Sequence, residues 1–195
     1  MNLQPQLSEK LNWLQNSFYF IRKHYIVVLG AGLVAGFGRV VQLGGFGPIS
    51  STTHLLLEII IESARIMLVL YVLGLASVRN GLIRIGRFFT QKTNRKAQWD
   101  IAVQNLKKQW LSIILNLIGF AVIAWTLNYL IDLLAYETCL YLTLKKDGIL
   151  AQSASEWTLL LFFKNLSVIP FTLVFETLFI LWITNKLQRK AISLS

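Results

Sequence analysis

The 195-residue sequence is 55% hydrophobic, only 14% charged, and has a mean hydropathy of +0.57 with a net charge of +10. An ordinary soluble domain carries about 25% charged residues. The apolar residues here also form long runs, so the composition excludes such a domain and predicts an integral membrane protein. The single Cys139 cannot form an internal disulfide, and the two histidines leave little material for a metal site.

Residues 1–24 are predicted to form an interfacial helix. Apolar residues recur at alternating spacings of four and three, as a helical stripe requires, at Leu7, Leu11, Leu14, Phe18 and Ile21. Ser8 is a candidate N-cap. We expect this helix to lie on the inner membrane surface before the chain enters its first span.

The first predicted span, 25–46, contains a glycine motif with two interpretations. Gly30-x-Gly32-x-x-Ala35 resembles a dinucleotide fingerprint, but no acidic residue follows about 20 positions later and no second strand is predicted. The alternative is a helix-packing face of small residues, which lets membrane helices approach closely within a subunit or between copies. That face, which we favour, consists of Ala31, Gly32, Ala35 and Gly36.

Residues 54–77 form the second predicted span, followed by a basic loop at 78–109. The loop mixes apolar and basic residues as an interfacial amphipathic helix does, and helical spacing from Ala97 is expected to continue into the third span. Anionic lipid ranks first among its expected ligands, an acidic protein second and nucleic acid last. The candidate docking residues are Arg79, Arg84, Arg87, Lys92, Arg95 and Lys96.

The third and fourth spans are predicted at 110–135 and 157–184. The outer loop between them, 136–156, contains Asp147-Gly148, a hairpin-turn signal that competes with a continuous helix. A basic tail, 185–195, ends the chain. The whole sequence is expected to form one all-α membrane domain of four transmembrane helices.

Lysine and arginine predict the orientation of these spans. Residues 1–24 carry three of them, residues 78–109 carry eight and the tail carries three, whereas the outer loop carries two. Because basic residues accumulate on the cytoplasmic side, both termini are expected to be cytoplasmic, in a bacterial inner membrane.

Six charged residues fall between the midplane and the outer face when their depth is taken from the helical rise of about 1.5 Å per residue. An unpaired charge in a span costs at least about 2.5–3.5 kcal/mol, so such residues normally pair inside the protein. Their balance of three positive and three negative charges favours a salt-bridge network over a pore. This charge cluster comprises Arg39, Glu58, Glu62, Arg65, Asp132 and Lys164.

Glu176 is the exception, because it is placed in the inner half of the fourth span with no basic residue at matching depth. Pro170 is expected to kink the same helix. Together they form a candidate gate or proton site, with a neutral hydrogen-bonded glutamate as the alternative.

No catalytic motif or cofactor site is found, so an enzyme is not expected. The favoured hypothesis is a non-enzymatic membrane protein that assembles with itself or a partner and docks anionic lipid or an acidic protein on its basic cytoplasmic face. The alternative is a small oligomeric ion channel, such as a membrane-depolarising effector, that uses the intramembrane charges.

Overall fold

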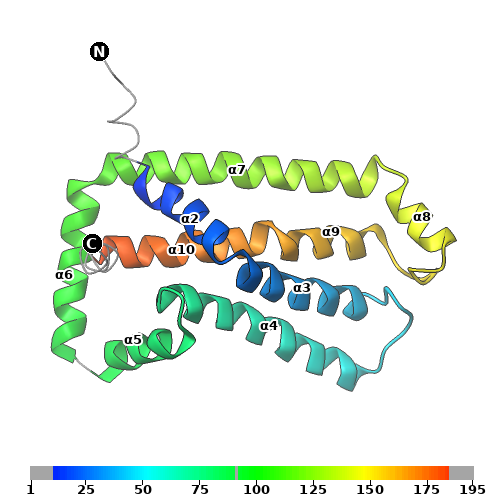
Figure 1. Cartoon of the computed structure of the whole chain (residues 1–195), viewed down its shortest axis with the longest axis horizontal. Helices are drawn as coiled ribbons and strands as arrows, with labels where there is room; N and C mark the ends of the chain where they lie inside the picture. The colour runs from blue at the N-terminus through cyan, green and yellow to red at the C-terminus, as the bar shows by residue number, and fades with distance from the viewer. Residues whose placement is uncertain (1–10, 91, 185–195) are drawn as a thin grey trace, which may run out of the picture. The chain divides into compact units, whose positions relative to one another are not determined.

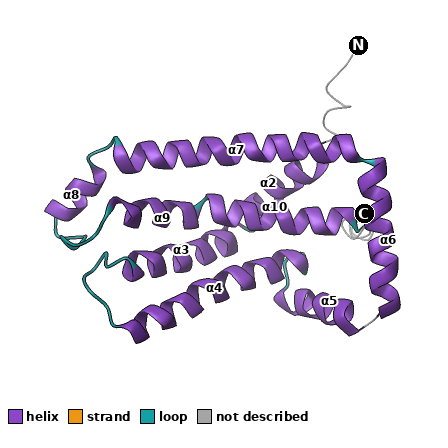
Figure 2. Ribbon diagram, turned by 180° about the vertical axis from the view of Figure 1, so that it is seen from behind, coloured by secondary structure: helices purple, strands orange, loops and turns teal. Residues whose placement is uncertain are grey.

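The protein is described by a computed structural model covering residues 11–90 and 92–184, without the side chains of residues 92–95. These residues form helices and loops with no strand among them (Figures 1 and 2), which confirms the all-α prediction. The helices are α2 (Asn12–Lys23), α3 (Tyr25–Gln42), α4 (Ser51–Leu73), α5 (Val78–Thr90), α6 (Lys92–Lys108), α7 (Trp110–Tyr136), α8 (Leu140–Lys146), α9 (Glu156–Leu166) and α10 (Val168–Ile183).

Three helical segments are long and apolar enough to cross a membrane, namely α3, α7 and the α9–α10 pair, counted over the described residues. A fourth is added if α4 and α5, which are bent by 83° at the break between them, count as one span. Helix α7 nearly coincides with the predicted span at 110–135. The lengths therefore agree with a membrane protein of three to four spans.

The other three predicted spans have different ends. The first stops at Gln42 instead of residue 46, because Gly44 adopts a positive φ of 70° and its neighbour Gly45 donates a hydrogen bond back to the Val40 carbonyl. The second is shifted to 51–73 and also ends in a left-handed turn, at Leu75 and Ala76. The fourth is divided at Ser167 into α9 and α10.

The chain divides into two compact units, each assembled from separated stretches of sequence. Of the described residues, the first unit comprises those within 11–24, 69–122 and 173–184, and the second comprises 25–68 and 123–172. Because α4, α7 and α10 each contribute residues to both units, the units are not successive domains along the sequence.

In the first unit, α2 is packed through an aromatic cluster. Trp13 is fully buried, and its ring centroid lies 4.8–5.5 Å from those of Phe175, Phe179 and Trp182. Aromatic pairs at this separation add stability beyond the area they bury. The predicted stripe is only partly right. Leu14 is buried and Leu11 and Ile21 are half-buried, but Phe18 is exposed, and the stripe leaves out the buried Trp13 and Ser17. Leu7 and Ser8 lie outside the described residues.

The first turn of α2 is capped from another helix. The backbone N–H of Leu14 donates to Oδ1 of the buried Asn116 on α7 over 3.0 Å. The first N–H groups of a helix have no partner within it, so this amide replaces a local N-cap. One turn further along α7, the absence of a side chain at Gly119 leaves space for Leu14. Both contacts fix α2 against α7.

The basic segment of the first unit is two helices with a break before the next span. The backbone of α5 approaches the end of α4 so closely that a Cβ on Gly81 would clash with the Leu70 carbonyl. Helix α6 ends at Lys108, and Gln109 separates it from α7, so the expectation of a continuous helix into the third span is wrong. Figures 1 and 2 show α6 running crosswise to the start of α7.

In the second unit, α9 is surrounded by α3, α7 and α8. Val40 of α3, Tyr141 of α8 and Leu159 of α9 belong to one buried cluster, and Ile131 and Leu160 belong to another. The outer loop forms the short helix α8, which ends before Gly148, so the hairpin interpretation is wrong and the chain does not continue as one helix either. Gly148, with φ of 70°, terminates α8 because the Ile149 N–H donates to the Leu144 carbonyl.

His24, at the junction before the first candidate span, provides a pH-dependent contact in the first unit. Its Nδ1 lies 3.1 Å from the Tyr71 hydroxyl, and its ring lies 4.6 Å from the Phe20 ring, centroid to centroid, in a tilted arrangement. Burial, and secondly the charge of Lys23, lower the pKa of His24 from its ordinary value. The folded state therefore binds this proton less readily than the unfolded state does.

We expect the stability of the protein in detergent to fall as the pH is lowered through and below the unfolded histidine pKa of about 6.5. The contribution of His24 to the free energy of unfolding is present in full above that pH. It is lost at lower pH, because the unfolded state binds the proton at a higher pH than the folded state does. Thermal melts between about pH 8 and about pH 5 measure it. His24→Gln should flatten this dependence, and an unchanged pH profile in that variant would contradict the assignment.

Candidate functional site

A group of ion pairs links α3 and α4 in the second unit. Arg39 on α3 donates two hydrogen bonds to the carboxylate of Glu58 on α4, from Nη1 over 2.8 Å and from Nη2 over 3.0 Å. Such two-pronged arginine–carboxylate pairs are stronger and more directional than single contacts. The side chains are 22% and 38% exposed respectively. The pair thus fixes the relative register of two candidate span helices.

The group continues along α4 to α9. Glu62 lies 3.6 Å from Arg39 and 2.5 Å from Arg65, so its carboxylate stands between two arginines. Arg65 Nη2 donates to Oδ1 of Asn165 on α9 over 2.8 Å. Asn165 is almost fully buried and also donates to the Leu161 carbonyl. We call Arg39, Glu58, Glu62 and Arg65 the ion-pair network.

Two neutral amides, which sequence analysis does not select, complete the network. Gln42 Nε2 donates to Glu58 over 2.8 Å, and Gln42 Oε1 accepts from Arg39 over 2.6 Å. Asn165 satisfies Arg65 in the same manner. Both amides are buried in the structure. In the sequence they are polar residues within apolar helices, and that feature could have indicated them, because buried polar groups need hydrogen-bond partners. Their effect is to satisfy charged groups without adding charge.

The ion-pair network contains four of the six predicted cluster residues. Asp132 on α7 and Lys164 on α9 are half-buried, and neither forms an ion pair within 4 Å with any residue that the structure describes. The four that do meet are two arginines and two glutamates, so the network is electrically balanced without the other two. The network is therefore neutral through its own four residues and does not need Asp132 or Lys164 to balance it.

The candidate gate residues lie in different units. Glu176 is on the exposed face of α10 in the first unit, and no ion pair joins it to the described part of the chain. Pro170 is buried in the second unit, three residues after the break at Ser167. Proline lacks the N–H that would bond to the Leu166 carbonyl, which accounts for a helix break here.

The predicted helix-packing face contacts α9 within the second unit. A Cβ on Gly32 would lie 2.9 Å from the Asn165 backbone oxygen and 3.4 Å from Pro170 Cγ. A Cβ on Gly36 would lie 3.1 Å from the ring of Phe162. Ala31 and Ala35 are buried. Small residues therefore let α3 approach the backbone of α9, and they bring Asn165 into reach of Arg65.

The basic residues of α5 differ in their surroundings. Arg79 and Arg87 are exposed, and so is Lys96 on α6. Arg84 is half-buried and donates from Nη1 to the Leu73 carbonyl at the end of α4 over 2.5 Å. The side chains of Lys92 and Arg95 lie outside the described residues. Large apolar side chains are exposed on the same helix, including Leu82 at 55% and Phe89 at 70%.

No family model, no curated protein and no solved structure matches this chain.

Proposed function

We propose that this chain is a non-enzymatic membrane protein whose helix α5 lies on the cytoplasmic surface and binds anionic lipid headgroups. The observation that carries the proposal is the arrangement of α5: it leaves α4 at an 83° bend and exposes both arginines and large apolar side chains. If α4 crosses the bilayer, a helix nearly perpendicular to it lies in the plane of the interface.

The composition of the exposed surface of α5 favours lipid over an acidic protein. Each lysine or arginine near an anionic membrane contributes about 1 kcal/mol of attraction. Leu82 and Phe89 suit the apolar side of an interfacial helix, because their burial at the headgroup boundary adds to the electrostatic term. A purely electrostatic protein contact would not require them. The excess of lysine and arginine in 78–109 supports a cytoplasmic location for this helix.

Assembly with a second copy or with a partner is part of the proposal, but the small-residue face does not support it. Gly32 and Gly36 are covered by α9 of the same chain. A subunit interface would instead use exposed apolar positions on other helices, such as Trp125 or Ile118 of α7.

An ion pore is the second candidate, and the geometry favours it less. Both glutamates of the ion-pair network lie within 4 Å of an arginine, so neither offers a free carboxylate to a passing cation. A pocket of about 450 Å³ borders the network at Gln42, and its lining contains no carboxylate among the described residues, which are Gln42, Gly44, Pro48, Ile49, Ser50, Ser51 and His54.

The proposal is tested by neutralising the exposed arginines of α5. In proteoliposomes, we expect Arg79→Gln/Arg87→Gln to lower the preference for spin-labelled phosphatidylglycerol over phosphatidylcholine by several-fold, up to about thirtyfold at about 1 kcal/mol per arginine. Electron spin resonance of the labelled lipid measures this preference. It should also weaken with added salt, since exposed charges are screened.

A matched control neutralises Lys107→Gln/Lys108→Gln, because these two lysines are exposed on α6 and carry the same charge. We expect the control to change the lipid preference much less. Equal losses in the two variants would show that only net charge matters and would contradict α5 as the binding surface.

A further inference from the structure

Two adjoining cavities open between α5, α6 and α10 in the first unit. Their volumes are about 1000 Å³ and about 340 Å³. They share four lining residues, Phe88, Gln98, Ile180 and Thr184. Together they form one hollow, which we call the α5–α6–α10 cavity. Each part by itself lies within the range of a site for a small molecule or a cofactor, about 300–1,000 Å³.

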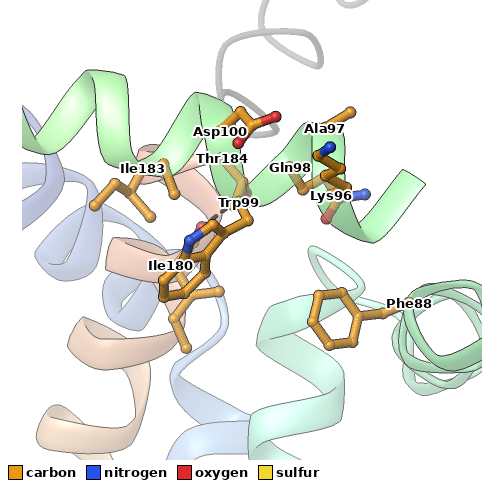
Figure 3. Close-up of a pocket in the computed structure, with 10 residues that line it drawn as sticks. Phe88, Lys96, Ala97, Gln98, Trp99, Asp100, Ile180, Ile183 and Thr184 are labelled. Atoms are coloured by element: carbon orange, nitrogen blue, oxygen red, sulfur yellow. Dashed lines mark hydrogen bonds between the residues drawn. The ribbon is translucent and has the colours of Figure 1, made fainter. Parts of the chain in front are cut away.

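The lining of the larger part is mainly apolar. Figure 3 shows Phe88 entering from α5, Trp99 from α6, and Ile180 and Ile183 from α10. Lys96 and Asp100 of α6 also border it. Apolar lining with few polar groups suits a hydrocarbon, because each buried CH₂ contributes about 0.8 kcal/mol to binding.

Arg84 lines the smaller part of the cavity. Only one hydrogen bond is described for its guanidinium, the bond to the Leu73 carbonyl, although the group has five N–H donors. No carboxylate of the described residues lies within 4 Å of it. A half-buried cation beside apolar walls is unfavourable unless an anion accompanies it. The cavity therefore combines an apolar space with a cation that has no counter-charge among the described residues.

We propose that the α5–α6–α10 cavity binds one anionic membrane lipid, with an acyl chain between Phe88, Trp99 and Ile180 and the headgroup anion paired with Arg84. This inference rests on the proposed function and deepens it by assigning a single defined site.

The bound lipid should differ from lipid on the surface of α5 in stoichiometry and in salt dependence. A headgroup anion paired with a half-buried arginine is screened less than one on an exposed helix. Native mass spectrometry of the full chain, extracted in mild detergent and washed at high salt, tests this. We expect one phosphatidylglycerol per chain to remain bound, or to rebind on back-addition, in preference to phosphatidylcholine.

Arg84→Gln should lower the lipid-bound fraction by on the order of tenfold or more, since it removes the partner of a poorly solvated anion. Arg84→Lys keeps the charge and should retain most of the lipid. Lys107→Gln is the matched control, because it removes the same charge from an exposed position outside the cavity lining and should leave the bound lipid unchanged. Ala102→Phe, which fills the larger part of the cavity, should displace the lipid while circular dichroism shows unchanged helix content.

Retention of the lipid by Arg84→Gln would overturn the proposal, and so would equal binding of phosphatidylcholine or no lipid on the wild-type chain after back-addition. Binding of free phosphate in place of a lipid would also overturn it. The proposed function fails separately, if Arg79→Gln/Arg87→Gln leaves surface lipid selectivity intact while Arg84→Gln abolishes the single bound lipid.

Discussion

Replacing Arg39 by methionine is expected to lower the free energy of unfolding in detergent by about 3 kcal/mol, the largest loss among charge changes in this chain. The substitution preserves most of the apolar stem and removes the guanidinium. Glu58 then loses its two-pronged partner, and Gln42 is its one remaining side-chain donor among the described residues. A carboxylate held between helices without a cation must either remain charged at a high cost or take up a proton.

The expected loss comes from the carboxylate that is left behind, so it should be recovered when that carboxylate is removed. We expect Arg39→Met/Glu58→Gln to be more stable than Arg39→Met alone, with a coupling energy of about 1–3 kcal/mol in the double-mutant cycle. Denaturant titrations of the wild type, the two single variants and the double variant measure this coupling energy. Arg22→Met, at an exposed position of α2, is the control for loss of one charge. Additive effects of the two network substitutions would show that the ion pair contributes nothing specific.

The ion-pair network shows which contacts of this chain can be predicted from its sequence and which cannot. Residue number and helical rise place Arg39, Glu58, Glu62 and Arg65 at neighbouring depths, and the structure brings these four together. The same argument placed Asp132 and Lys164 with them. Depth along a helix follows from sequence, but the direction in which a side chain points depends on how the helices pack. The direction of the side chains therefore distinguishes the four members of the ion-pair network from Asp132 and Lys164.

The ends of helices show a comparable limit. Long apolar runs predict α7 almost to the residue, because nothing within them interrupts a helix. The break at Ser167 lies within an apolar run, so hydropathy does not reveal it. At Gln109 the chain changes from the polar α6 to the apolar α7, but a change in hydropathy marks the start of a span without showing that the helix is interrupted. The Asp147-Gly148 pair marks a real left-handed turn, although it ends α8 and does not connect strands. Such a local signal specifies backbone geometry without specifying the flanking elements.

The α5–α6–α10 cavity could not be anticipated at all. Its lining residues come from α4, α5, α6 and α10, which are separated by more than a hundred positions in the sequence. Arg84 reads as one of several equivalent basic residues in the loop, yet it alone among Arg79, Arg84 and Arg87 is half-buried. Only the packing of α5 against the end of α4, through Gly81, distinguishes it.

Replacing Gly32 by alanine is expected to destabilise the protein by about 1–3 kcal/mol, even though alanine is the better helix former. The added Cβ would lie 2.9 Å from the Asn165 backbone oxygen, and a backbone atom cannot rotate away as a side chain can. Helix α9 must therefore shift. Because Asn165 is also the partner of Arg65, the shift should weaken the hydrogen bond that links the ion-pair network to α9.

Gly30→Ala provides the matched control on the same helix. A Cβ at Gly30 meets nothing within 4 Å, so this variant gains helix propensity without a clash and should be as stable as the wild type or more stable by up to about 1 kcal/mol. Thermal melts in detergent compare the two. If both substitutions changed stability equally, α3 would not depend on close approach to α9. Opposite signs would show that the glycines of the VVLGAGLVAG stretch serve helix packing at Gly32 and are dispensable at Gly30, which a nucleotide-binding loop would not permit.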